Sequence, residues 1–517
     1  MLNESRCQIP SVRPMETIDR VVVAYVTLPL AVFLIGWFRF WVAIPLLALM
    51  AYSLTPLATV QRFTAEISRH TTKQIWLALA AGFVWTLFGG TGHWFFANSD
   101  WHIRDAVLHD LVASPWPVGY GIFNEMETLL RAPVAYFLPA ALIGKAVGLP
   151  AAHIAMATWT AIGVSLFLMQ ILSEAPSKIT VALKIFAIVI LFSGLDIVGQ
   201  LLQGGPRFRA EWNITSHLEW WARIYQYSSM TTQLFWVPNH AIGAWLTVGL
   251  ISRHEGSTAI DALIPLMIVA AMLWSPLSAL GLIPIAAFKA ISSMLREHSF
   301  ALLHPRVWLP SLIVGIVVMG FLGLDPGGIP RTWTLNQTGE GPAMGIARQA
   351  QFFLFEAGLI GFSILWIRRS TYTILALVIL AILPVVSFGA ANDFAMRASI
   401  PSLAVLCIAA CRALCVESGQ ADVSTKKITL VFLLAIGAIT PLQEFARAMV
   451  VPAWAANLQA TLVGADCGRF PAHYVARTQH EVILLLMKHP NRLTIGDTGP
   501  ASCKNPAETA LERGDQK

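Results

Sequence analysis

The 517-residue chain is 56% apolar and only 12% charged, whereas soluble domains carry about 25% charged residues. This composition, with a mean hydropathy of +0.63, excludes an ordinary soluble domain and predicts a polytopic membrane protein. Basic cytoplasmic loops are sufficient to explain the net charge of +6, so we expect no nucleic-acid partner.

Long apolar runs recur along the chain and set the predicted fold. A helix needs about 20 mostly apolar residues to cross a bilayer. We therefore expect an all-α integral membrane protein with about 12–14 transmembrane helices and additional interfacial helices on the outer side. The boundary at Trp274-Ser275-Pro276 fits either a tight turn or a kink in one longer helix. The predicted membrane segments are 21–38, 41–57, 75–92, 132–149, 151–173, 180–202, 237–252, 259–275, 277–295, 307–325, 349–367, 371–388, 398–416 and 428–446.

Lysine and arginine in short loops predict which side of the membrane each loop faces. Basic residues place loops 58–74 and 417–427 in the cytoplasm. Counting spans from the N-terminus places loop 203–236 inside, whereas counting back from the C-terminus places it outside. We therefore expect one apolar segment within 132–202 to be re-entrant or divided into half-helices, with 203–236 outside.

This topology divides the chain into a cytoplasmic segment 1–20, a multi-pass domain 21–446 and a small external tail 447–517. The outer loops are expected to be 93–131, 203–236 and 326–347. Cys467 and Cys503 both lie in the tail, where an oxidising compartment would favour a disulfide between them.

The first outer loop gathers ionisable and aromatic residues in the stretch "NSDWHIRDAVLHDL". Asn98 or Ser99 can cap a helix that starts near Asp100 and lies along the membrane surface. His102, Asp105 and His109 have helical spacing, so they share one face of this helix. We expect that face to be wetted by solvent, and a divalent metal site is the alternative.

A surface helix directly after a membrane span, with an acidic residue near its start, resembles the first external loop of the GT-C class of membrane glycosyltransferases. In that class the loop holds a catalytic Asp or Glu, and Asp100 stands at the matching position here. The resemblance implies a sugar donor linked to polyprenyl phosphate and a reaction at the outer face of the inner (plasma) membrane.

The chemistry of such a transfer needs a base and a cationic group. A carboxylate can take the proton of an acceptor hydroxyl as that hydroxyl attacks the sugar, and Asp100 is the candidate. The departing phosphate needs positive charge or hydrogen-bond donors. Arg104, one helical turn further on, can contact phosphate or pair with Asp100. The alternative for Asp100 is that it stabilises only the start of the helix.

Further polar residues stand beside apolar segments, where they are candidates for substrate contacts. An aromatic-rich stretch at 211–241 ends in Asn239-His240 at the start of a span, and "GAANDFAMRASIP" lies between two spans. Asp196 lies near the end of another apolar run. The candidate substrate-binding residues are Arg104, His217, Glu219, Asn239, His240, Asn392, Asp393 and Arg397.

We therefore predict a membrane glycosyltransferase that moves a sugar from a polyprenyl-phosphate-linked donor to a glycan, lipid or protein acceptor. A transporter or flippase is the alternative, as is a polymerase or acyltransferase acting on lipid-linked glycans. The sequence contains no P-loop, dinucleotide glycine motif or zinc signature. A divalent cation is the one cofactor that we consider.

Overall fold

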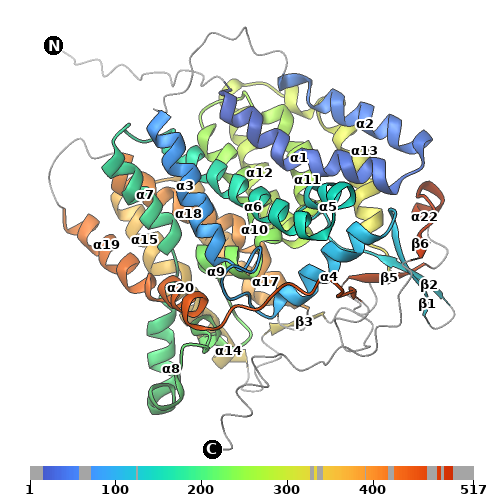
Figure 1. The fold of residues 1–517 in the computed structure, drawn as a ribbon. Coiled ribbons are helices and arrows are strands. Elements are labelled where there is room, and N and C mark those ends of the chain that lie inside the picture. The colour runs from blue at the N-terminus through green and yellow to red at the C-terminus, as the bar shows by residue number, and fades with distance from the viewer. Residues whose placement is uncertain are drawn as a thin grey trace, which may run out of the picture.

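In the computed structural model the chain forms a bundle of helices with small sheets at its edge (Figure 1). The structure describes residues 15–57, 72–123, 126–325, 331–334, 342–389, 392–416, 424–462, 474–478 and 482–492. The predicted Cys467–Cys503 disulfide and most of loop 326–341 lie outside these residues.

The helices follow the predicted apolar segments closely. In the first half they are α1 (Thr17–Trp37), α2 (Phe40–Ser53), α3 (Thr72–Phe88), α4 (Asp100–Ala113), α5 (Leu138–Val147), α6 (Leu149–Leu172), α7 (Ile179–Leu191), α8 (Asp196–Glu211), α9 (Met230–Trp236) and α10 (Pro238–Arg253). In the second half they are α11 (Ile264–Trp274), α12 (Pro276–Glu297), α13 (Pro305–Leu322), α14 (Pro342–Phe353), α15 (Leu359–Ile367), α16 (Thr371–Ile382), α17 (Asp393–Ala398), α18 (Ile400–Cys411), α19 (Thr425–Gly437), α20 (Ile439–Val450) and α22 (Val482–Leu486).

Within the described residues, nine helical stretches are long and apolar enough to cross a membrane, so the chain is a multi-pass membrane protein. The outward sides of these helices expose large apolar side chains such as Phe40, Leu295 and Phe432. The expected 12–14 spans exceed this number because α3, α5, α10, α11 and α16 have only 10 to 17 residues. At 1.5 Å per residue, a ten-residue helix reaches about 15 Å, half of the hydrocarbon core.

The re-entrant segment expected within 132–202 remains a prediction, and α5 is a helix of that range that is too short to cross a membrane. The chain before it runs into the bundle, where the Tyr136 hydroxyl lies 2.7 Å from Thr160 Oγ1 in the middle of α6. Helix α5 then returns, and Lys145 near its end donates a hydrogen bond to the carbonyl of Ser114 after α4. Gly148, with φ of 111°, turns the chain into α6.

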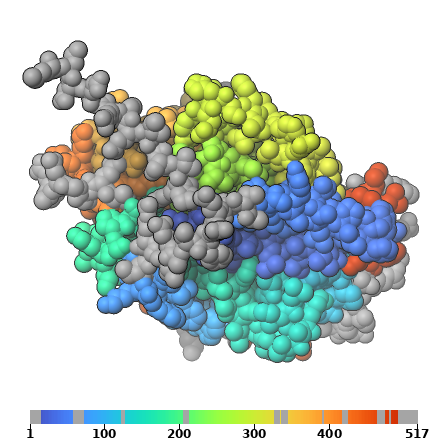
Figure 2. All heavy atoms as spheres, turned by 90° about the horizontal axis from the view of Figure 1, so that it is seen from above, coloured from blue at the N-terminus to red at the C-terminus, as the bar shows by residue number. Residues whose placement is uncertain are grey.

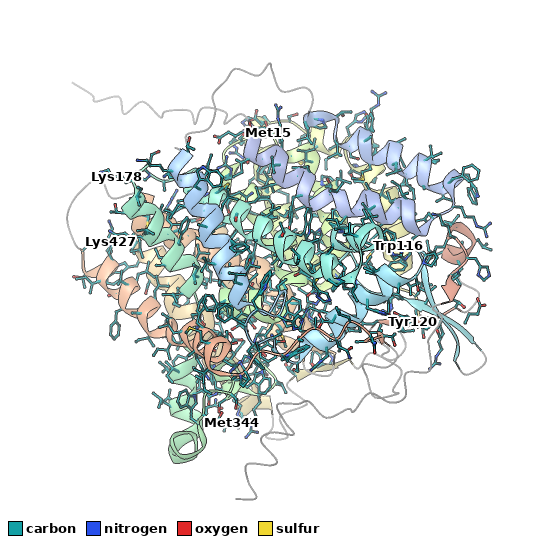
Figure 3. All side chains as sticks on the ribbon, viewed as in Figure 1. Met15, Trp116, Tyr120, Lys178, Met344 and Lys427 are labelled. Atoms are coloured by element: carbon teal, nitrogen blue, oxygen red, sulfur yellow. The ribbon has the colours of Figure 1, made fainter. Side chains whose placement is uncertain are left out.

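The labelled residues in Figure 3 mark two opposite sides of the bundle. In Figure 3, Met15, Lys178 and Lys427 lie along one side, and Tyr120 and Met344 lie along the opposite side. We call the latter end, which also holds α4, the site face. Figure 2 views the molecule from above and shows α1 and α2 (blue) beside α13 (yellow-green).

The described part of the C-terminal tail packs on the first outer loop at the site face. Strands β1 (Val118–Phe123) and β2 (Met126–Leu130) form a hairpin, which β5 (Val475–Arg477) and β6 (Asn491–Arg492) extend on either side. A second small sheet pairs β3 (Arg331–Trp333) with β4 (Val386–Phe388). The backbone N–H of Leu462 also donates to Asp110 Oδ2 at 2.9 Å.

Candidate functional site

Helix α4 begins at Asp100, as the sequence predicted, because Asn98 supports its first turn. The Asn98 side chain accepts a hydrogen bond from the Asp100 N–H at 3.1 Å and donates to the carbonyl of Phe235 at 2.8 Å. Trp101 also donates to that carbonyl and is fully buried. The helix is therefore packed into the protein along much of its length.

Asp100 and Arg104 form an ion pair across one turn of α4. Arg104 Nη2 lies 3.3 Å from Asp100 Oδ2, and its Nε lies 3.5 Å from Asn239 Oδ1 on α10. The Asp100 side chain is 45% exposed, whereas that of Arg104 is 6% exposed. Within the described part of the chain, Arg104 Nη1 has no hydrogen-bond partner. The pair thus combines an accessible carboxylate with a buried cation.

A run of hydrogen bonds connects the start of α10 to α17. His240 Nδ1 lies 2.8 Å from Ser275 Oγ, in the turn that separates α11 from α12. Ser275 caps α12 by accepting the N–H of Ser278, whose hydroxyl donates to the carbonyl of Arg397 at 3.1 Å. Residues from separate segments of the sequence therefore meet at the site face.

The third polar segment supplies a second ion pair and its support. Arg397 Nη2 lies 2.9 Å from Asp393 Oδ1, and both side chains are about a quarter exposed. Asn392 adopts a left-handed φ of 54°, accepts the Ala395 N–H and donates to the carbonyl of Ile224. Asn392 is buried, so its contacts hold the segment in place.

Tyr474, from the tail, is buried within electrostatic reach of both ion pairs. Burial raises the pKa of its phenol, the guanidinium groups of Arg104 and Arg397 act to lower this pKa, and the nearby carboxylates act to raise it. Those carboxylates belong to Asp100 and Asp393. The structure therefore brings together a set that we call the convergent site: Asp100, Arg104, Asn239, His240, Asp393 and Arg397.

His217 and Glu219 are buried in other surroundings, so the structure does not add them to the convergent site. The His217 ring stacks on Trp220 with centroids 4.8 Å apart. Burial, and then the charge of Arg447, lower the pKa of His217 to about 3. Glu219 accepts hydrogen bonds from the Ser229 N–H at 2.9 Å and from Gln226 at 2.8 Å.

A cluster of buried carboxyl groups lies around Asp196, the first residue of α8. Asp196 Oδ2 accepts hydrogen bonds from the Ser193 hydroxyl at 3.0 Å and from the Thr440 hydroxyl at 2.8 Å. Glu356 accepts the Trp221 indole N–H at 2.6 Å. We call Asp196, Glu219 and Glu356 the carboxyl cluster. Burial, and then the negative charge of Asp196, raise the pKa of Glu219 to about 8.

Sequence reasoning missed Glu356, although a signal was present. This residue is a lone acid within the apolar stretch "FFLFEAGLIGF", and ionisable groups inside a membrane segment are functional candidates. It lies on a π-helical turn, Leu354–Gly358, of the kind that is frequent at functional sites. Gly194 permits the close approach, because a Cβ there would lie 2.2 Å from Glu356 Oε2.

The prediction that solvent wets this face of α4 is wrong for Asp105, because that residue is only 1% exposed. The helix packs against α5 and α6, so this side faces the protein. His102 stacks on Trp454 with centroids 4.2 Å apart, and His109 lies 3.1 Å from Asp110. The structure therefore does not join His102 and His109 to Asp105.

Comparison with known proteins adds no assignment to this geometry. No family model matches the chain, and no curated protein or solved structure matches it.

Proposed function

We propose that the chain is a membrane glycosyltransferase that moves a sugar from a polyprenyl-phosphate-linked donor to a glycan, lipid or protein acceptor. The proposal rests on the convergent site, where the accessible Asp100 carboxylate pairs with Arg104 and the charge of Arg397 acts on the same buried tail residue, Tyr474. The resemblance to the GT-C class supports the same assignment for Asp100.

In the proposed reaction, the acceptor hydroxyl oxygen attacks the anomeric carbon while its proton passes to Asp100. A new glycosidic C–O bond forms as the bond from the sugar to phosphate breaks. The phosphate leaves with the bonding electrons, and its growing negative charge is stabilised by Arg104 and Arg397. The Arg104 Nη1 donor, which has no partner among the described residues, would gain an acceptor in this step.

The location of the site suits a donor with a long lipid tail. The convergent site lies at one end of a bundle whose sides expose apolar side chains, such as Ile35 and Leu295. A polyprenyl chain could remain in the hydrocarbon while its phosphate and sugar reach the charged residues. We place this end at the outer face of the plasma membrane, because loops 58–74 and 417–427 carry the basic residues expected on the cytoplasmic side.

A transporter is the second candidate, and the carboxyl cluster favours it. Buried carboxyl groups within membrane helices are typical of proton and ion pathways. Within the described residues, Asp196 Oδ1 and Glu356 Oε2 are buried and have no hydrogen-bond partner. A cation or a shared proton could therefore occupy this position.

One reconstitution separates the two candidates. Purified protein in vesicles is given a polyprenyl-phosphate donor with a radiolabelled sugar and a cell-envelope acceptor fraction, and a parallel sample is assayed for proton flux. The transferase proposal predicts labelled acceptor and no flux above that of empty vesicles. Flux without any transfer from donors carrying hexoses or pentoses would contradict it in favour of a transporter.

A further inference from the structure

A cluster of potential metal ligands lies beside the convergent site. His93 follows α3, Asp105 is on α4 and His153 is near the start of α6, and one ligand atom from each residue lies within 4.8 Å of the other two. The His93 Nε2 faces both carboxylate oxygens of Asp105, at 2.9 and 3.2 Å. The His153 Nδ1 lies 3.9 Å from the same carboxylate.

The hydrogen bonding of His93 restricts its protonation. Its Nδ1 lies 3.1 Å from the carbonyl oxygen of Trp454, which can only accept a hydrogen bond, so Nδ1 carries the hydrogen. A neutral His93 ring then points the lone pair of Nε2 at the Asp105 carboxylate. These groups repel each other unless a cation or a second proton lies between them.

His153 adds an independent observation. It is 6% exposed, and neither ring nitrogen has a hydrogen-bond partner within the described residues. A buried imidazole without partners is destabilising, and a ligand at this position would offset that cost. A proton shared by His93 and Asp105 would leave His153 unexplained, whereas a metal ion would engage both rings.

We propose that His93, Asp105 and His153 bind a divalent transition metal of the Zn²⁺ class. Imidazole nitrogens with one carboxylate oxygen are a common donor set for this ion. Neighbouring ligand atoms of a tetrahedral zinc ion are ~3.3 Å apart. The distances from the Asp105 carboxylate to His93 Nε2, 2.9 Å, and to His153 Nδ1, 3.9 Å, lie on either side of this value. The bond from His93 to the Trp454 carbonyl is the outer support that metal-binding histidines usually have.

The proposed metal site connects separate parts of the fold next to the convergent site. It would fasten the turn after α3 to α4 and α6, and through Trp454 it would also hold the tail. Asp105 directly follows Arg104, so the ion would fix the orientation of the helix that carries Asp100. Three protein ligands leave a fourth position for water. The inference does not depend on sugar transfer.

Zn²⁺ binding by the full-length protein in detergent tests the proposal. Protein stripped with a chelator is titrated with Zn²⁺ against a chromophoric competitor, and bound metal is measured by elemental analysis. We expect about one Zn²⁺ per chain. Affinity should fall more than about 100-fold in His153→Gln, because loss of an outer support alone costs 10- to 100-fold. The matched control is His109→Gln, on α4 but outside the cluster.

His153→Gln is the decisive variant because, in the part of the chain that the structure describes, neither nitrogen of His153 has a hydrogen bond to lose. Asp105→Asn should also abolish binding, with its folding followed by gel filtration. Wild-type protein that takes up no Zn²⁺ would overturn the proposal and leave His93 and Asp105 as an ion pair. So would a His153→Gln protein that binds Zn²⁺ as tightly as the control.

Discussion

Arg104 and Asp100 are an unequal pair, because the guanidinium is 6% exposed and the carboxylate 3.3 Å away is 45% exposed. Packing fixes Arg104, whose guanidinium also lies 5.2 Å from the Trp101 ring. Its charge therefore orients Asp100 while one side of the carboxylate stays open to a substrate. An ion pair between two fully solvated side chains would contribute little to such positioning.

Arg397 should contribute to donor binding. If it contacts the donor phosphate, Arg397→Ala removes a charge-assisted hydrogen bond of about 1.5–3 kcal/mol, which corresponds to roughly a 10- to 100-fold rise in the donor KM. Arg397→Lys should recover part of this loss. The control is Arg306→Ala, at the opposite end of the bundle. The KM is measured by saturation kinetics with the lipid-linked donor. An unchanged KM in Arg397→Ala would contradict a contact between Arg397 and the donor phosphate.

Glu219 should make stability depend on pH. Its pKa in the folded protein is about 8, against 4.5 for a free side chain. Between these values the folded state keeps a proton that the unfolded chain releases, so stability falls as pH rises. The difference in stability between Glu219→Gln and wild type should therefore shift in favour of the variant as the pH rises from 5 to 8. Thermal melts in detergent across this range test this, and a Tm difference that does not vary with pH would contradict it.

His217 gives the opposite slope and can be separated from Glu219. Its folded pKa of about 3 lies below the usual 6.5, so the unfolded chain gains a proton first as pH falls. Stability is therefore lost from about pH 6.5 downward. Wild type and Glu219→Gln both retain His217, so its contribution cancels when the two proteins are compared at the same pH.

Glu356 should tolerate an amide better than an alanine. Glu356→Gln can still accept the Trp221 N–H, whereas Glu356→Ala leaves that buried donor unsatisfied and opens a cavity. We expect the alanine variant to lose about 2 kcal/mol or more of unfolding free energy and the glutamine variant less. Glu297→Ala, at an exposed position, is the control. Equal denaturation midpoints for all three variants would argue against the cluster as a packed element.

Local spacing explains which parts of the structure the sequence could predict. Apolar length located α6 within two residues of its observed bounds, and the Ser-Pro dipeptide correctly marked the turn between α11 and α12. The pairs Asp100–Arg104 and Asp393–Arg397 also follow from helical spacing. Each of these features depends on residues that are close in sequence.

Contacts between distant segments could not be predicted in this way. Asp105 appears exposed when only α4 is considered, because its partners lie before the helix and 48 residues beyond it in α6. Spacing within α4 instead suggested His102 and His109 as its neighbours.

The proposed orientation predicts which positions are accessible from each side. Leu202→Cys on α8 and Met344→Cys on α14 should react with an impermeant thiol reagent added outside cells, whereas Lys178→Cys and Lys427→Cys should not. Both side chains are exposed, and Figure 1 shows α8 and α14 at the site face. A cysteine-free background is required, and lysed cells provide the positive control. Labelling of Leu202→Cys only after lysis would reverse the orientation.

The most direct test of the central claim is sugar transfer by Asp100→Asn. This change keeps the shape of the side chain and removes the proton acceptor, so the rate should fall about 10²- to 10⁴-fold while the amount of folded protein stays the same. Glu297→Gln is the matched control. Asp105→Asn is unsuitable as a control because that residue is buried. Of Asp100→Asn and Glu297→Gln, only Asp100→Asn should lose labelled acceptor. Transfer at the wild-type rate in Asp100→Asn would contradict the role of Asp100 as the base.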